Sequence, residues 1–146
     1  MRIVHNRQVD GNLKEQLGPY EIESLLSEAD EAAATAYRVR IEPHQRTNTS
    51  YHKIAEEFYY VLEGTGVAFL DGLSHELCQG DFLRLPPGTT HCFVTANEAL
   101  VLLDIHCPGS RPNRDVYFVD ATPRGFAPPS EPDLNHNVLG ESKTTD

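Results

Sequence analysis

Two histidines and one glutamate stand at positions from which strands could bring them together. Four residues separate His52 from Glu57, and His91 follows shortly after a proline–glycine turn. Two imidazoles and a carboxylate that leave coordination positions open are the ligand set of catalytic zinc sites and of the facial triad of non-haem iron(II) enzymes. A hydrogen-bonded polar cluster that closes a barrel without metal is the alternative, and we favour the metal.

The elements that must position these residues are short strands. Apolar and β-branched runs between turn residues predict strands over residues 37–41, 57–62, 67–70, 74–77, 82–85, 91–95 and 99–105. The dipeptide Asp71-Gly72 between two of them indicates a tight hairpin. Short strands at this spacing are typical of a sandwich or barrel, and hence of an all-β fold.

The N-terminal part of the chain is less regular. Residues 20–34 have a helical composition, whereas residues 20–26 also alternate with a period of two. We predict a strand over residues 20–26 followed by a loop, and an edge strand over residues 2–5.

Alternation along a strand decides which side chains can meet. Glu57, Tyr59 and Val61 share one face of their strand, and His91 and Phe93 share one face of theirs. If both faces point into a barrel, the metal ligands and an aromatic lining come from the same rows. Phe93 is therefore a candidate for binding a substrate.

The glycines and prolines around these histidines carry a family resemblance. Residues 80–91, with the spacing Gly-x5-Pro-x-Gly-x2-His, resemble the second motif of the cupin superfamily. Residues 52–64, with the spacing His-x4-Glu-x6-Gly, resemble the latter part of its first motif. The resemblance covers residues 36–107 and implies an antiparallel jelly-roll barrel with metal ligands in its mouth, within one domain over residues 1–119.

The chain departs from the cupin pattern at three positions. The glycine of the first motif falls on His44, its first histidine falls on Ser50, and the asparagine that closes the second motif falls on Thr95. The resemblance therefore implies His52, Glu57 and His91 as ligands of one divalent ion: iron(II), zinc, manganese or nickel. Ser50 either binds the ion through water or leaves a position vacant, and weak or absent metal binding is a further alternative.

Other polar residues are candidates for proton transfer or substrate binding. Tyr59 shares the face of Glu57, so it is either an acid–base group or a packed aromatic. Asp104 and His106 share one face of the last strand. They form either a polar pair in the pocket, with Asp104 binding substrate and His106 moving a proton, or ordinary surface. His44 follows a proline and is either a replacement ligand or, as we favour, a histidine of a surface loop.

Two arginines offer a different kind of contact. Arg38 and Arg40 lie on one face of their strand. Pointing inward, they would form a fork for a substrate carboxylate. Pointing outward, they would be solvated. Because burying two cations is costly, the outward orientation is favoured. Both are kept as candidate substrate-binding residues.

Composition excludes several classes of partner. Twelve Lys and Arg against 22 Asp and Glu give a net charge of −10, which argues against nucleic acid and against anionic membranes. No run approaches the ~20 apolar residues of a membrane span. The N-terminus has no apolar signal-peptide core, so a cytoplasmic protein is expected.

The C-terminal residues differ in composition from the rest. Four prolines alternate with polar residues after residue 120, which predicts an irregular tail, extended or disordered, over residues 120–146. A partner subunit could order part of it through Phe126 or Leu139. Because jelly-roll sheets have edges and apolar outer faces that a second copy commonly covers, we expect a homodimer.

These features predict a metal-dependent cupin enzyme that acts on a small polar or carboxylated metabolite. With iron(II), dioxygenase chemistry is expected. With another divalent metal, isomerase, epimerase, cyclase or lyase chemistry is expected. A non-catalytic cupin that binds a small molecule is the alternative, which the missing first histidine favours, and a purely structural subunit is a third.

Overall fold

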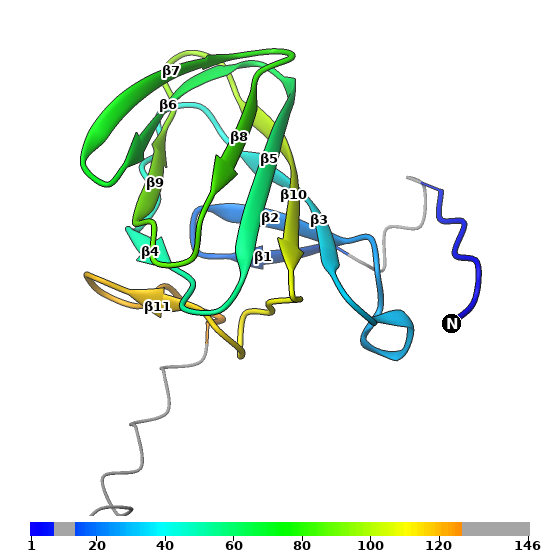
Figure 1. Ribbon diagram of the computed structural model, residues 1–146. Coiled ribbons are helices and arrows are strands. Elements are labelled where there is room, and N and C mark those ends of the chain that lie inside the picture. Colours follow the sequence, from blue (N-terminus) through cyan, green and yellow to red (C-terminus); the bar gives the residue numbers. More distant parts are fainter. Residues whose placement is uncertain (8–13, 127–146) are drawn as a thin grey trace, which may run out of the picture.

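The computed structural model describes residues 1–7 and 14–126 (Figure 1). In this part, eleven strands follow one another: β1 (Lys14–Leu17), β2 (Tyr20–Ser24), β3 (Thr35–Ile41), β4 (Ser50–Tyr51), β5 (Glu56–Glu63), β6 (Thr65–Leu70), β7 (Leu73–Cys78), β8 (Phe82–Leu85), β9 (His91–Val94), β10 (Leu100–Cys107) and β11 (Tyr117–Phe118). The 3-10 turn η2 (Glu28–Asp30) precedes β3. Among the described residues, we find no helix with the length and apolar character to cross a membrane.

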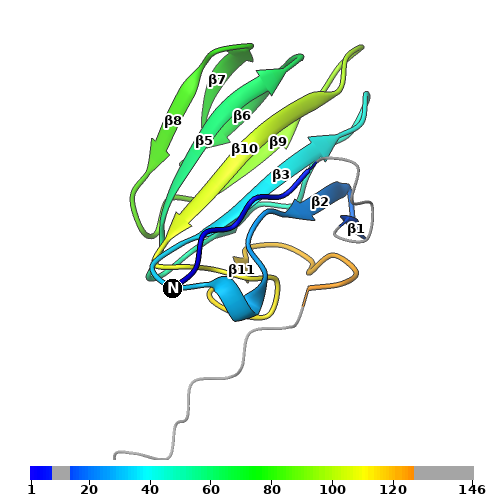
Figure 2. The same ribbon diagram turned by 90° about the vertical axis from the view of Figure 1, so that its right-hand side faces the viewer.

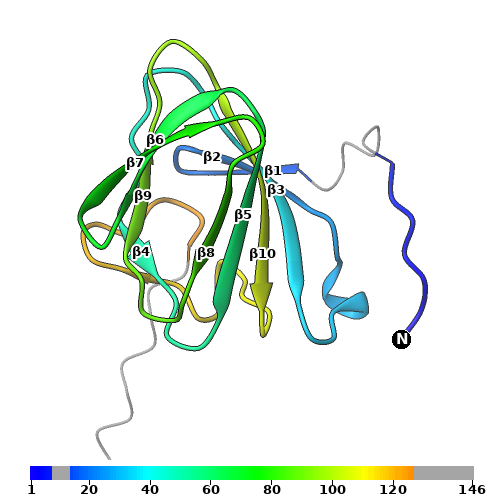
Figure 3. The ribbon, with the colours of Figure 1, turned by 45° about the horizontal axis from the view of Figure 1, so that its top comes forward.

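The strands form two antiparallel sheets that face each other (Figure 2; Figure 3). One sheet has six strands in the order β1-β2-β3-β10-β5-β8, and the other has five in the order β11-β4-β9-β6-β7. The chain crosses repeatedly from one sheet to the other, as in a jelly roll, and Gly64 alone joins β5 to β6. The predicted all-β, antiparallel jelly-roll fold is confirmed.

The core lies between the sheets because alternate side chains of each strand point inward. On β3, the inward row is Tyr37, Val39 and Ile41, all buried. Leu102 of β10 lies opposite Val39 and also opposite Val61 of β5. The strand β10 therefore sits between β3 and β5, and its inward row faces the centre of the barrel.

Two tight turns hold these strands in register. Asp71 and Gly72 both have positive φ, 48° and 81°, as the predicted hairpin between β6 and β7 requires. Gly64, between β5 and β6, has φ 81°, and a Cβ there would overlap the carbonyl oxygen of Ala99. Only glycine allows this approach of β5 to the start of β10.

The N-terminal part differs from the sequence prediction. Residues 2–5 form no strand. Side chains of this segment make its contacts instead: Arg2 pairs with Asp30, and the side chain of Asn6 donates to the carbonyl of Leu25. The edge of the sheet is instead β1, which pairs with β2 in a hairpin. The strand predicted over residues 20–26 ends at Ser24. β4 and β11 were not predicted, since two-residue strands leave no pattern.

The first part of the predicted tail lies against the barrel. Residues 120–126 are irregular, as expected, but Phe126 packs edge-on against Phe118 and Tyr20, with ring centroids 5.0 and 6.2 Å apart. An apolar ring on this segment therefore finds an apolar partner within the same chain. Residues 127–146, with Leu139, lie outside the described residues.

Candidate metal centre

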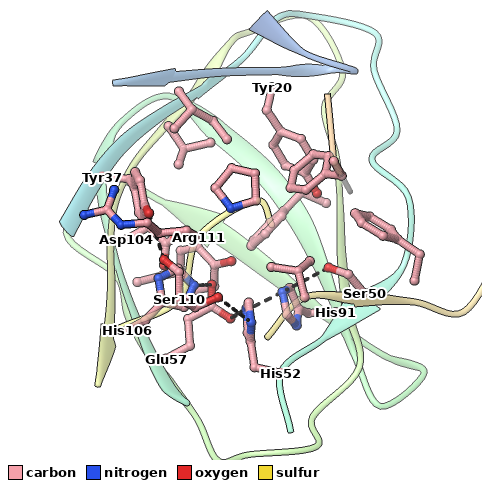
Figure 4. A pocket seen from close by; sticks show the side chains of 18 residues that line it. Tyr20, Tyr37, Ser50, His52, Glu57, His91, Asp104, His106, Ser110 and Arg111 are labelled. Atoms are coloured by element: carbon pink, nitrogen blue, oxygen red, sulfur yellow. Dashed lines mark hydrogen bonds and ion pairs between the residues drawn. The ribbon is translucent and has the colours of Figure 1, made fainter. Parts of the chain in front are cut away.

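The candidate ligands come from both sheets and meet inside one end of the barrel (Figure 4). His52 follows β4, Glu57 lies in β5, and His91 is the first residue of β9. All three are buried and line one cavity. The cavity leaves about 70 Å³ for the centres of water-sized atoms, which is room for about five water molecules.

Two imidazole nitrogens lie close to one carboxylate oxygen. Glu57 Oε2 lies 3.1 Å from Nε2 of His52 and 3.3 Å from Nε2 of His91. Atoms that each lie about 2.0–2.2 Å from one zinc ion are about 3 Å from one another. The spacing therefore suits a shared ion. Oε2 is buried and has no hydrogen-bond partner among the described residues.

The other nitrogen of each imidazole is held by a backbone carbonyl group. His52 Nδ1 lies 2.6 Å from the carbonyl oxygen of Asp115, and His91 Nδ1 lies 3.0 Å from that of Thr89. A carbonyl oxygen only accepts, so each Nδ1 donates, and in a neutral imidazole each Nε2 keeps a lone pair. Two lone pairs and a carboxylate oxygen thus face one another. Such an arrangement needs a cation, either a metal ion or a proton on one imidazole.

Burial and charge oppose each other at these groups. Burial lowers the pKa of His52, but the adjacent Glu57 carboxylate outweighs it and raises that pKa. At His91 burial dominates and lowers the pKa. Burial disfavours the charged form of Glu57, but the charges of His91 and His106 hold its pKa well below the usual range. Glu57 is thus a carboxylate, and the lowered pKa of His91 favours its neutral form, as a metal site needs. The raised pKa of His52 favours a proton on that ring, which a metal ion would have to displace.

Glu57 also belongs to a second cluster of buried polar side chains, with Asp104 and His106. His106 Nε2 lies 3.0 Å from Glu57 Oε1 and 3.7 Å from Asp104 Oδ1, and the hydroxyl of Thr35 lies 3.4 Å from His106 Nδ1. Burial, together with the charge of Glu57, raises the pKa of Asp104 well above its ordinary value. Asp104 therefore keeps its proton to a higher pH than Glu57 does, a difference typical of acid–base sites.

The remaining candidates on the inward rows also lie in the cavity wall. The ring of Tyr59 meets Phe93 and His91 edge-on, with centroids 5.1 and 6.1 Å apart. Burial raises the pKa of Tyr59, so its hydroxyl stays a donor. Ser50 Oγ lies 3.5 Å from His91 Nε2, beside the candidate ion position. His44 is exposed in a surface loop, outside the cavity lining.

The two arginines do not face the cavity. Arg38 Nη2 lies 3.6 Å from Glu63 Oε1, and Arg40 Nε donates to Glu42 Oε1 at 2.8 Å, on the outer face of the six-stranded sheet. The prediction that Arg38 and Arg40 bind a substrate is therefore wrong. Apolar residues that alternate with them fill the core at no cost in charge desolvation.

Sequence reasoning missed the loop that closes the site. The carboxylate of Asp115 accepts hydrogen bonds from the backbone N–H groups of Lys53, Ile54 and Ala55 at 2.8–3.2 Å, while its carbonyl holds His52. These partners precede Asp115 by 60 to 63 residues. No local pattern distinguishes this aspartate from a surface residue, so only the folded chain identifies it.

Comparison with known families agrees with this geometry. Residues 37–106 match the model of the cupin domain. The chain contains a cupin domain. In this cupin the matched segment runs from β3 to β10 and contains His52, Glu57, His91 and His106. Residues before and after it, including Asp115, are not part of the match.

Known proteins share the sequence or the fold of this cupin. Protein SchB of Streptomyces halstedii is 28% identical over 102 residues, which are 68% of this chain and 74% of that protein. Pac13, a nucleoside dehydratase, has 18% identity and a TM-score of 0.67, over 82% of this chain and 94% of that one. A variant of Streptomyces PAC13 has been solved with uridine. The DMSP lyase DddQ of Ruegeria pomeroyi has 22% identity and a TM-score of 0.56, over 61% of this chain and 47% of that one.

Proposed function

We propose that this cupin is a metal-dependent enzyme in which His52, Glu57 and His91 hold one divalent ion. One observation carries the proposal: a buried carboxylate oxygen without a hydrogen-bond partner faces the Nε2 atoms of two imidazoles whose Nδ1 atoms are already engaged. Three buried electron-pair donors at this spacing favour a metal ion over a purely hydrogen-bonded cluster.

Of the reactions expected from the sequence, we propose a lyase-type elimination of a small metabolite. Such a reaction needs a group that takes a proton from carbon and another that gives a proton to the leaving oxygen. His106 Nε2, whose proton faces Glu57 Oε1 at 3.0 Å, can give a proton, and Asp104 Oδ1, 3.7 Å from that nitrogen, can take one. The Tyr59 hydroxyl can hold a substrate oxygen. A bound divalent ion would polarise that oxygen.

Two fold neighbours support this reaction class, since one is a nucleoside dehydratase and the other a DMSP lyase. The balance of the elimination is simple. The C–H electron pair becomes the new double bond, and the leaving group departs with the proton of the acid. With zinc, manganese or nickel in the site, no oxidant is required, whereas iron(II) would open the dioxygenase route.

A non-catalytic cupin that binds a small molecule is the second candidate. Ser50 favours it, because the position of the family's first histidine offers only a hydroxyl, 3.5 Å from His91 Nε2. A site with one ligand fewer holds its ion less tightly. A panel of metabolites separates the two functions: thermal shifts without turnover would indicate the binding protein, and product formation the enzyme.

Metal analysis tests the site itself. Protein purified without chelators should contain close to one divalent ion per chain, and His91→Ala should lose it. His75→Ala is the matched control, because His75 is exposed on β7 and lies outside the cavity. Cobalt(II) absorption adds a readout that does not depend on activity. Equal, near-zero metal in wild type and His91→Ala would remove the metal proposal.

We also propose that two copies associate. Tyr60 and Phe82 lie opposite each other on β5 and β8, and they are 44% and 61% exposed on the outer face of the sheet, next to its β8 edge. A second copy could cover these rings and this edge. Light scattering should give twice the mass of the 16.3 kDa chain, and a monomeric mass would contradict the proposal.

A further inference from the structure

The cavity has a polar floor and an apolar roof. Figure 4 shows Tyr20 on the side opposite His52. The roof consists of Tyr20 and Ile22 of β2 and of Phe118 and Phe126 from the segment after β10. Both roof segments lie outside residues 37–106, which match the cupin domain. The roof is therefore supplied by parts of this chain that the family match does not include.

The two roof segments are packed against each other. The ring of Phe126 meets those of Tyr20 and Phe118 edge-on, at interplanar angles of 71° and 69°. Gly125 approaches Leu17 so closely that a Cβ would overlap the leucine side chain. This packing gives the roof a defined shape, so it can serve as one wall of a binding site.

No free lysine or arginine lines the cavity within the part of the chain that the structure describes. Arg111 is the one lysine or arginine in that lining, and its charge is already matched. Its Nε donates to Glu31 at 2.6 Å, and its Nη2 donates to the carbonyl of Leu26 at 3.2 Å. Glu57 adds a carboxylate to the floor. Without a bound ion, a carboxylate ligand would meet this negative charge and no unmatched lysine or arginine.

Neutral hydrogen-bonding groups are present at the floor. The hydroxyls of Ser50 and Tyr59 line the cavity, and Asp104 Oδ1 is buried without a hydrogen-bond partner among the described residues. Groups of this kind suit a carbonyl or hydroxyl oxygen of a ligand. The aromatic rings of the roof suit a flat apolar surface.

We infer that the cavity binds an uncharged ligand, with a flat apolar part against the roof and a carbonyl or hydroxyl oxygen at the floor. The inference rests on the proposed function, in that this ligand is the substrate or a part of it. It narrows the polar or carboxylated metabolite expected from the sequence to the uncharged class.

Benzamide and benzoate form a matched pair of probes, since they differ in charge and little in shape. Ligand-observed NMR titrations measure both, in chelator-treated and in zinc-loaded full-length protein. Benzamide should bind in about the millimolar range that its size allows. Benzoate should bind at least about tenfold more weakly in the chelator-treated form. The zinc-loaded form measures how much a bound ion itself adds to the affinity for the carboxylate.

Two phenylalanine variants test the roof. Phe126→Ala should weaken benzamide binding about three- to tenfold, because it removes one aromatic wall. Phe69→Ala should leave binding unchanged, because that ring lies on β6 against Arg46 and does not line the cavity. In the chelator-treated form, benzoate binding as tightly as benzamide, no binding of benzamide, or equal effects of the two variants would each overturn the inference.

These outcomes are separable from the proposed function. Benzamide selectivity that depends on Phe126, found in a protein that holds no metal, would keep the inference and remove the metal-dependent enzyme. Tight metal binding together with a preference for benzoate in the chelator-treated form would keep the metal site and remove the inference.

Discussion

Asp115 gives the sharpest test of how the site is held, because it contacts the candidate ligand His52 only through its backbone carbonyl. We expect Asp115→Ala to weaken metal binding without removing a ligand. Its carboxylate accepts from three backbone N–H groups, those of the exposed Lys53 and Ile54 and of the buried Ala55. Two exposed N–H groups regain water at a cost of about 0.5–1.5 kcal/mol each, and the buried one is left unpaired at about 1–3 kcal/mol.

The expected loss of stability is therefore about 2–6 kcal/mol. A domain of this kind has about 5–15 kcal/mol, so most of its molecules should still fold. In Asp115→Ala, we expect the loop over residues 52–55 to lose these hydrogen bonds and to become more mobile, and His52 with it. Removing a group that orients a metal ligand typically costs about 10–100-fold in affinity. Asp115→Asn keeps one acceptor oxygen and should fall between wild type and Asp115→Ala.

Thermal unfolding and competitive zinc titration against a chromophoric chelator measure both effects on the same samples. Asp81→Ala is the matched control, because Asp81 accepts from the backbone N–H of Cys78 at 2.9 Å in a turn outside the cavity lining. It should cost about 1 kcal/mol and leave zinc affinity unchanged. Wild-type zinc affinity in a destabilised Asp115→Ala would refute the positioning of His52. Unchanged stability would refute the hydrogen-bond reasoning.

Two further changes test the vacant ligand position and a buried ion pair. Ser50→His should place a third imidazole beside the site and tighten zinc binding at least about tenfold in the same titration; equal or weaker affinity would show that the serine does not mark a vacant ligand position. Glu31→Gln should lower stability by about 1–2 kcal/mol at neutral pH, because Arg111 and Arg114 lose their carboxylate partner. Burial opposes the charged form of Glu31, but the two arginines outweigh it and lower its pKa below 4.5. The stabilisation is therefore present above pH 4.5 and is lost as the pH falls through the lower, folded value. Thermal unfolding at about pH 7 and about pH 3 checks this, and a difference between wild type and variant that persists undiminished in acid would contradict it.

Much of the fold could be predicted from local patterns. Alternation with a period of two, interrupted by glycine and proline, identified most of the strands from β3 to β10, because a strand and its turns are encoded by neighbouring residues. Motif spacing singled out His52, Glu57 and His91, and the structure brings these three side chains together. The short strands β4 and β11 left no such trace.

The residue types of the candidate site and the strands that carry them were determined by the sequence alone. Which rows point inward was decided by the tertiary structure, which covers one face of each strand with the opposite sheet: Asp104 and His106 are buried there, and Arg38 and Arg40 are not. Two further features are seen only in the folded chain. One is the set of hydrogen bonds between Asp115 and the loop at His52, and the other is the aromatic roof of the cavity. Such contacts join residues that are far apart in sequence, and no window of neighbouring residues contains both partners.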